Sequence, residues 1–95
     1  MFTATNTREI RQDLLTCDLF LKLGYVNIAE NKAYAVLEAL KGSPIAMENL
    51  VTIYLVKGEI ENARMTLNVL RKDLLYRKRA QHLLKLIEED RISSI

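Results

Sequence analysis

Apolar side chains recur along this chain at intervals of three and four residues, the spacing that brings them to one side of an α-helix. Two such stripes are Ile10, Leu14, Cys17, Phe20 and Leu21, followed by Ala29, Ala33, Val36, Leu37 and Leu40. The alternation of apolar and polar residues that is typical of a half-buried strand is absent. The pattern therefore predicts an all-α protein.

Glycine and proline divide this pattern into segments. With these breaks, we expect helices over residues 6–23, 26–41, 44–57, 60–72 and 75–90. Ser43 before Pro44 is typical of an N-cap followed by a first-turn proline. Asn27 with Glu30 has the spacing of a capping box, as do Asn6 and Glu9. Short turns between the helices predict antiparallel helical hairpins.

The sequence also repeats itself with a period of about 34 residues, which is the separation between Gly24 and Gly58. At this offset several positions carry similar residues in both halves. The pairs are Phe20 and Tyr54, Leu21 and Leu55, Val26 and Ile60, Ala29 and Ala63, Ala33 and Leu67, and Val36 and Leu70. We therefore expect two equivalent hairpins followed by a fifth helix.

With this period and these residues the chain resembles the tetratricopeptide repeat. The residues that carry the resemblance are Cys17, Phe20, Gly24, Ala29 and Ala33 in the first unit, and Leu50, Tyr54, Gly58, Ala63 and Leu67 in the second. It implies a single domain over residues 1–95 with a first repeat at about 10–43, a second at about 44–77 and a capping helix at about 78–90. Val51, Leu70 and Pro44 depart from the pattern of the family, which implies irregular packing.

A second, narrower resemblance is to an uncharacterised bacterial family in which tetratricopeptide-like repeats follow a membrane region. It is carried by the stretch Ile53-Tyr54-Leu55-Val56-Lys57-Gly58 and by Leu74-Leu75-Tyr76-Arg77-Lys78 with Ala80. This resemblance implies no mechanism. It leaves the compartment open, because the chain could be a soluble region of a membrane-attached protein.

Candidate catalytic chemistry is sparse. The 95 residues contain one histidine, His82, and one cysteine, Cys17. A metal site needs three or four ligands, and the isolated glycines do not form a phosphate-binding loop. We therefore predict a protein that is not an enzyme and that has no metal or cofactor. No apolar run approaches the roughly 20 residues needed to span a bilayer.

Stacked helical hairpins offer a concave surface, which the first helices of successive hairpins line. The register of the resemblance assigns to this surface Leu14, Asp18, Leu21, Ile45, Glu48, Thr52, Leu55 and Val56. These residues suit an amphipathic helix or an apolar peptide of a protein partner. The alternative is that a neighbouring repeat or a second copy of the chain covers them.

One related function remains open beside this adaptor or assembly role. Small tetratricopeptide-like chains can act as secretion chaperones that hold a helical partner in an apolar groove. The carboxylate-clamp function of the family is disfavoured, because Asp18 at a clamp position would repel a C-terminal carboxylate.

The net charge is only +2, but basic residues gather in one stretch. They are Arg71, Lys72, Arg77, Lys78, Arg79 and Lys85. Such a cluster is ordinarily a solvated helix face, and it can also contact an acidic protein, an anionic membrane or nucleic acid. Nucleic acid is the less favoured partner, because only Tyr76 supplies an aromatic ring and no reading motif is present.

The first predicted helix carries apolar residues on more than one face, among them Leu15, Leu19 and Leu23. A helix of this kind is expected to be buried on several sides. Arrays of this type generally need about three or more units with polar caps, and the chain supplies two hairpins and one helix. We therefore expect a homo-oligomer or a fragment of a longer array.

Overall fold

A computed structural model describes the backbone of residues 2–93 and the side chains of residues 8–89. Five helices make up the fold, and no strand occurs in this part of the chain. They are α1 (Phe2–Lys22), α2 (Val26–Ala39), α3 (Pro44–Lys57), α4 (Ile60–Leu70) and α5 (Arg77–Ser93). The predicted all-α class is confirmed.

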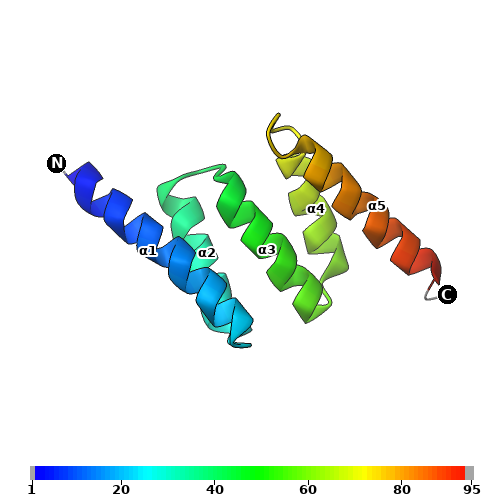
Figure 1. Ribbon diagram of the computed structural model, residues 1–95, viewed down its shortest axis with the longest axis horizontal. Coiled ribbons are helices and arrows are strands. Elements are labelled where there is room, and N and C mark those ends of the chain that lie inside the picture. Colours follow the sequence, from blue (N-terminus) through cyan, green and yellow to red (C-terminus); the bar gives the residue numbers. More distant parts are fainter. Residues whose placement is uncertain (1, 94–95) are drawn as a thin grey trace.

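The helices lie in chain order in an elongated array that measures 52 × 30 × 16 Å (Figure 1). Each helix packs on the next one, and α1 also contacts α3. The tight turns of both hairpins, α1–α2 and α3–α4, lie along one edge of the array (Figure 1). The longer links, residues 40–43 and 71–76, lie along the opposite edge.

The two hairpins turn in the same way at equivalent positions of the repeat. In the first, the amide of Gly24 donates to Leu21 O over 3.1 Å and the amide of Tyr25 donates to Phe20 O over 2.8 Å. The second hairpin repeats both bonds, from Gly58 to Leu55 at 3.1 Å and from Glu59 to Tyr54 at 2.7 Å. This pair of bonds is a Schellman motif, which requires a left-handed residue. Gly24 and Gly58 supply it with φ of +89° and +78°.

Equivalent positions are also buried in the same way. Ala29 and Ala63 are fully buried near the start of α2 and α4, where a small side chain lets the two helices of a hairpin approach closely. Further along the same helices Val36 and Leu70 are buried as well. The period read from the sequence is therefore a structural repeat.

Two apolar clusters share α3. The first joins α1, α2 and α3 around Cys17, Leu50 and Ile53. The second joins α3, α4 and α5 around Val51 and Leu67. Because α3 contributes to both clusters, it connects the two hairpins.

The helix starts agree with the sequence only in part. Ser43 is the N-cap of α3, and its Oγ accepts a hydrogen bond from the amide of Ala46 at 3.4 Å. The capping boxes at Asn27 and Asn6 are wrong, because both residues lie inside helices. The N-cap of α2 is Tyr25, which makes no side-chain cap, since the preceding Schellman turn already sets the entry of the chain into α2.

The start of α5 also differs from its predicted position. We expected a helix from residue 75, and α5 begins at Arg77. The Asp73 carboxylate accepts a hydrogen bond from the amide of Leu75 at 2.9 Å. This local turn competes with the first turn of a helix. The link between α4 and α5 is therefore longer than expected, and it exposes Leu74 and Leu75.

We predict that Gly58→Ala lowers the free energy of unfolding by about 1–2 kcal/mol, because an L-residue with a Cβ is strained at positive φ. No atom lies within 4 Å of the added Cβ, so the cost comes from the backbone and not from a clash. Gly58→Asn should cost less, since asparagine tolerates the left-handed region. Urea denaturation measures both values, and equal losses for Ala and Asn would contradict this explanation.

We predict that Ala63→Leu destabilises the fold by about 1–3 kcal/mol, because a fully buried alanine cannot take a larger side chain without strain. Ala63 lies in the second core cluster, between α4 and its neighbours. Ala35→Leu, on the exposed surface of α2, is the matched control. It should change stability by about 0.5 kcal/mol or less. Thermal unfolding compares the two variants, and a neutral Ala63→Leu would place this residue outside the core.

Candidate functional site

One hollow among the described residues is a groove between α2 and α4 with α3 as its floor. Its volume is about 330 Å³. The lining residues are Tyr34 and Leu37 from α2, Met47, Leu50 and Tyr54 from α3, and Met65, Thr66 and Val69 from α4. We call this the α2–α4 groove. It exists because α2 and α4 both pack on α3 but do not approach each other closely.

The walls of the α2–α4 groove are apolar and open to solvent. Met65 is 65% exposed and Val69 is 49% exposed, although both side chains are hydrophobic. Leu50 on the floor is buried at 3% exposure. A hollow with a buried apolar floor and exposed apolar walls can accept apolar side chains of a ligand.

Polar groups gather beside this groove around the Tyr54 hydroxyl. The hydroxyls of Tyr34 and Tyr54 are 2.6 Å apart, and the Tyr34 hydroxyl also donates to Glu30 at 3.3 Å. Lys57 approaches the other Glu30 oxygen at 2.8 Å. The hydrogen bond to Glu30 raises the pKa of Lys57, so its ammonium group stays charged. The hydrogen bond to Tyr54 raises the pKa of Tyr34, which keeps its phenol neutral.

None of the eight residues predicted from the sequence lines the α2–α4 groove. They lie on α1 and α3, and only some of their side chains are free of contacts within the chain. Leu21 and Leu55 pack against the two core clusters. Asp18 pairs with Lys22 at 3.1 Å. Their assignment to a partner-binding surface stays a prediction.

Among the other residues of this predicted surface, some side chains are exposed and others form contacts within the chain. Ile45 and Val56 are 49% and 61% exposed, and Leu14 on α1 is half-buried. The hydroxyl of Thr52 donates to the backbone oxygen of Glu48 at 3.3 Å.

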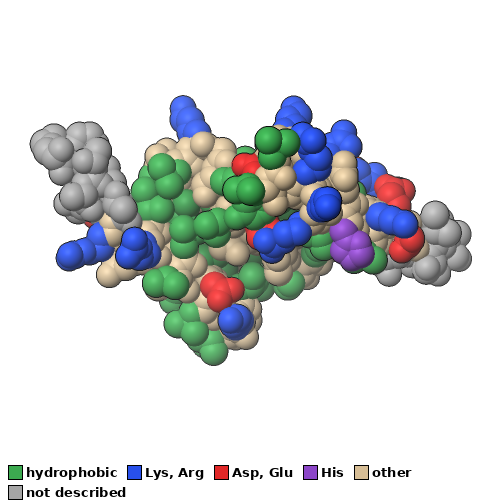
Figure 2. Space-filling model, turned by 45° about the horizontal axis from the view of Figure 1, so that its top comes forward, with side chains coloured by type: hydrophobic (Ala, Val, Ile, Leu, Met, Phe, Trp, Pro, Cys, Tyr) green, Lys and Arg blue, Asp and Glu red, His purple; other side chains and the backbone are tan. Residues whose placement is uncertain are grey.

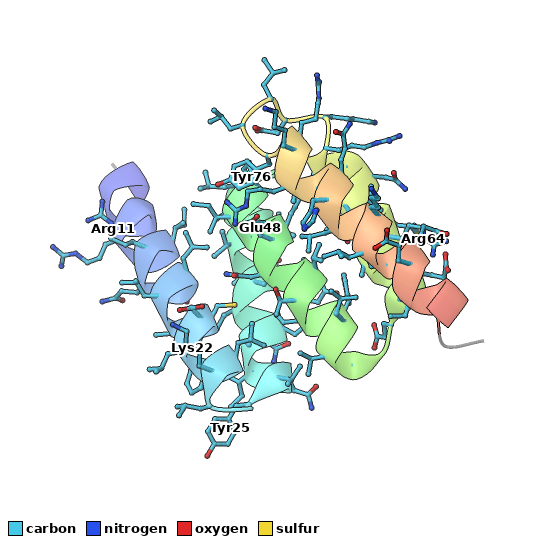
Figure 3. The ribbon with its side chains drawn as sticks, turned by 45° about the vertical axis from the view of Figure 1, so that its right-hand side comes forward. Arg11, Lys22, Tyr25, Glu48, Arg64 and Tyr76 are labelled. Carbon is cyan, nitrogen blue, oxygen red and sulfur yellow. The ribbon has the colours of Figure 1, made fainter. Side chains whose placement is uncertain are left out.

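Glu48 itself is engaged by α5. Both of its carboxylate oxygens lie near Arg79 Nη2, at 2.8 Å and 3.0 Å. The Arg79 guanidinium also lies 5.5 Å from the centre of the Tyr76 ring. Figure 3 shows Glu48 and Tyr76 together where α3 faces the start of α5, whereas Arg11 and Lys22 lie along α1. This ion pair is a polar contact between α5 and α3, and it engages one residue of the surface predicted from the sequence.

The predicted basic stretch divides into three parts. Arg71, Lys72, Arg77 and Lys78 are exposed around the α4–α5 link, and none of them forms an ion pair with a described residue. Arg79 is held by Glu48, and Lys85 lies two turns further along α5. In Figure 2, Lys and Arg side chains gather beside hydrophobic ones at the upper edge of the molecule, where Figure 1 places this link.

Cys17 and His82 lie on different helices. The Cys17 thiol is buried, and its Sγ donates to Ala29 O at 3.3 Å. Burial and the nearby charge of Asp18 raise the pKa of Cys17, so little thiolate forms near neutral pH. His82 is exposed on α5, and α5 does not pack on α1. The two residues therefore do not form a nucleophile and base pair.

Two further findings concern only the described residues. They contain no group of three or more His, Cys, Asp or Glu side chains placed to hold a metal ion. Within the same part of the chain, each helix is too short or too polar to cross a membrane.

The sequence did not identify the α2–α4 groove. Met65 and Val69 lie outside the buried stripe of α4 that contains Ala63 and Leu67. The only sign of the groove in the sequence was this apolar pair on the solvent side of the helix. It could not be interpreted without knowing that α2 brings Tyr34 to the facing wall.

The fold and the groove together define an all-α array of two equivalent helical hairpins with a fifth helix. Residues 1–95 match the model of a family described as a family of unknown function, DUF6057, and the chain belongs to that family. No curated protein and no solved structure matches the chain significantly. The tetratricopeptide resemblance stays a prediction.

The outer face of α1 bears on the predicted oligomer. Leu15, Leu19 and Leu23 are 66%, 52% and 60% exposed, and their helical spacing makes them one apolar stripe. We predict that the purified chain self-associates through this stripe, and that Leu19→Ser with Leu23→Ser shifts it towards monomer. Sedimentation velocity over a range of concentrations measures this shift. A wild-type chain that stays monomeric at high micromolar concentration would refute the prediction.

Proposed function

We propose that this protein is a non-catalytic binding module of tetratricopeptide-like architecture that holds an apolar, helical segment of a protein partner. The observation that carries the proposal is the α2–α4 groove, whose exposed walls contain Met65 and Val69 above a floor of buried Leu50. Exposed hydrophobic side chains around a hollow are typical of a protein-binding site.

The chemistry of the lining favours a helix as the ligand. The groove runs between two helices, so an amphipathic helix can lie along it and insert side chains at helical spacing. Methionine has a flexible side chain that adapts to differently shaped apolar groups, and Met47 on the floor and Met65 on the α4 wall both line the groove. The polar group of Glu30 and Lys57 can orient the polar face of such a helix.

Tyr54 on the floor of the groove connects α3 to its neighbours. Tyr54 packs against both core clusters and lines the groove, while its hydroxyl is hydrogen-bonded to Tyr34 across the α2–α3 contact. These contacts hold α2 and α3 in a fixed relation before a ligand arrives. A preformed site lowers the entropic cost of binding.

The test uses amphipathic helical peptides selected by display against the wild-type chain. Met65→Glu should lower the affinity for the selected peptides by roughly tenfold or more, because it places a charge in the apolar groove. Val56→Glu is the matched control, since Val56 is 61% exposed on the α3 surface predicted from the sequence. Isothermal titration measures both affinities, and circular dichroism confirms that both variants fold.

The two variants separate the competing surfaces. A loss of affinity with Met65→Glu alone supports the α2–α4 groove. A loss with Val56→Glu alone would move the site to the surface that includes Ile45 and Thr52, as the sequence predicted. Selection that yields no binding peptide, or binding that neither variant changes, would contradict the proposal.

A further inference from the structure

The link between α4 and α5, residues 71–76, is an ordered loop with an unusual composition. The amides of Lys72 and Asp73 donate to Val69 O and Leu70 O at 3.1 Å and 3.0 Å. The amide of Tyr76 donates to Asp73 O at 3.1 Å. These bonds fold the link into consecutive turns and define its shape.

Apolar anchors fix the loop at both ends. Leu70 is buried at 2% exposure where the loop begins, and the Tyr76 ring packs against the second core cluster where it ends. The side chains at the two ends of the loop are therefore packed in the core. Between these anchors, Leu74 and Leu75 point away from the core and are 78% and 86% exposed.

These two leucines are the most exposed large hydrophobic side chains among the described residues. The Asp73 carboxylate accepts the amide hydrogen of Leu75 at 2.9 Å, which stabilises the turn that projects them. Their exposure costs free energy in water unless another apolar phase covers them. The turn therefore presents two leucines in a position from which they can insert into an apolar environment.

Cations surround the leucines. Arg71 and Lys72 precede them, and Arg77 and Lys78 follow them. The Nε of Arg77 donates to Arg71 O at 3.2 Å, which closes the base of the loop and brings the two basic pairs together. Asp73 is the acid within this segment, and it is half-buried. The loop therefore combines two exposed leucines with four basic residues around them.

We propose that this loop is a membrane-surface contact that inserts Leu74 and Leu75 among the acyl chains of an anionic bilayer while Arg71, Lys72, Arg77 and Lys78 bind lipid headgroups. Aliphatic side chains flanked by Lys and Arg are typical of interfacial membrane binding. The positive charge of these four residues is complementary to anionic lipid. Each such cation increases the binding constant for an anionic membrane roughly fivefold.

The observations favour a bilayer over nucleic acid. The cations alone could bind phosphates of either partner. Contacts to bases use aromatic rings or polar side chains, and the tip presents two leucines between its cations instead, which suit acyl chains. The Tyr76 ring packs against the core cluster and lies near the Arg79 guanidinium.

The opposite edge of the array differs in charge. There the cations are paired, Lys22 with Asp18 and Lys57 with Glu30 and Glu59. The edge that carries the loop also carries the α2–α3 link (Figure 1). In that link, Leu40 and Lys41 are exposed. The two links thus present apolar and basic groups on one side of the molecule.

The chain contains no tryptophan, so a single tryptophan reports on its own site. In Leu75→Trp, we expect the fluorescence to shift to the blue on addition of phosphatidylcholine vesicles that contain phosphatidylglycerol, with a much smaller shift for phosphatidylcholine alone. Val56→Trp is the control at the opposite edge, at 61% exposure, and should not shift. No shift in Leu75→Trp, or equal shifts at both positions, would overturn the proposal.

Vesicle co-sedimentation separates the roles of the leucines and the cations. Leu74→Ser with Leu75→Ser should reduce partitioning onto anionic vesicles about tenfold or more. Lys72→Gln with Lys78→Gln should reduce it roughly fivefold for each residue. Ile28→Ser with Val56→Ser, at 43% and 61% exposure, is the matched control and should change little.

Each alternative has a distinct result. Partitioning that depends on the cations but not on Leu74 and Leu75 would overturn insertion. Binding to a duplex oligonucleotide without binding to vesicles would assign the loop to nucleic acid instead. Failure of the vesicle experiment leaves the α2–α4 groove untouched, because Leu74 and Leu75 do not line it.

Discussion

The arrangement depends on α3, which must bury two sides at once. Leu50 and Ile53 face the first hairpin, whereas Val51 faces α4 and α5. A helix that is apolar on several sides is stable only between partners. Packing of α3 on both sides therefore sets the positions of the helices on either side of it, and the ion pair between Glu48 and Arg79 adds a polar contact to α5.

The candidate surfaces follow from this packing. Because α2 and α4 both rest on α3, the space between them remains open and becomes the α2–α4 groove. Because the α4–α5 link spans from buried Leu70 to the packed ring of Tyr76, its middle residues stay in solvent. Exposed apolar groups thus occur where the repeat leaves an edge or a gap, as well as along the free face of α1.

Local and periodic signals predicted most of the fold. The recurrence of glycine at Gly24 and Gly58 indicated the hairpin turns, and Ser43 with Pro44 indicated the start of α3. The α4–α5 loop was missed because it depends on the hydrogen bond from Leu75 to Asp73, for which a single aspartate is a weak signal. The groove was missed because it depends on the distance between two helices that are not neighbours in sequence.

The central claim is that α3 joins both hairpins into one cooperative unit and so holds the groove in place. Native-state hydrogen exchange on Ile53→Val tests it, since Ile53 belongs to the first cluster and the substitution costs about 0.5–1.5 kcal/mol. We expect the amides of Ala33 in α2 and Leu67 in α4 to lose the same free energy of opening. A loss at Ala33 with unchanged protection at Leu67 would show that the hairpins open separately and would contradict the claim.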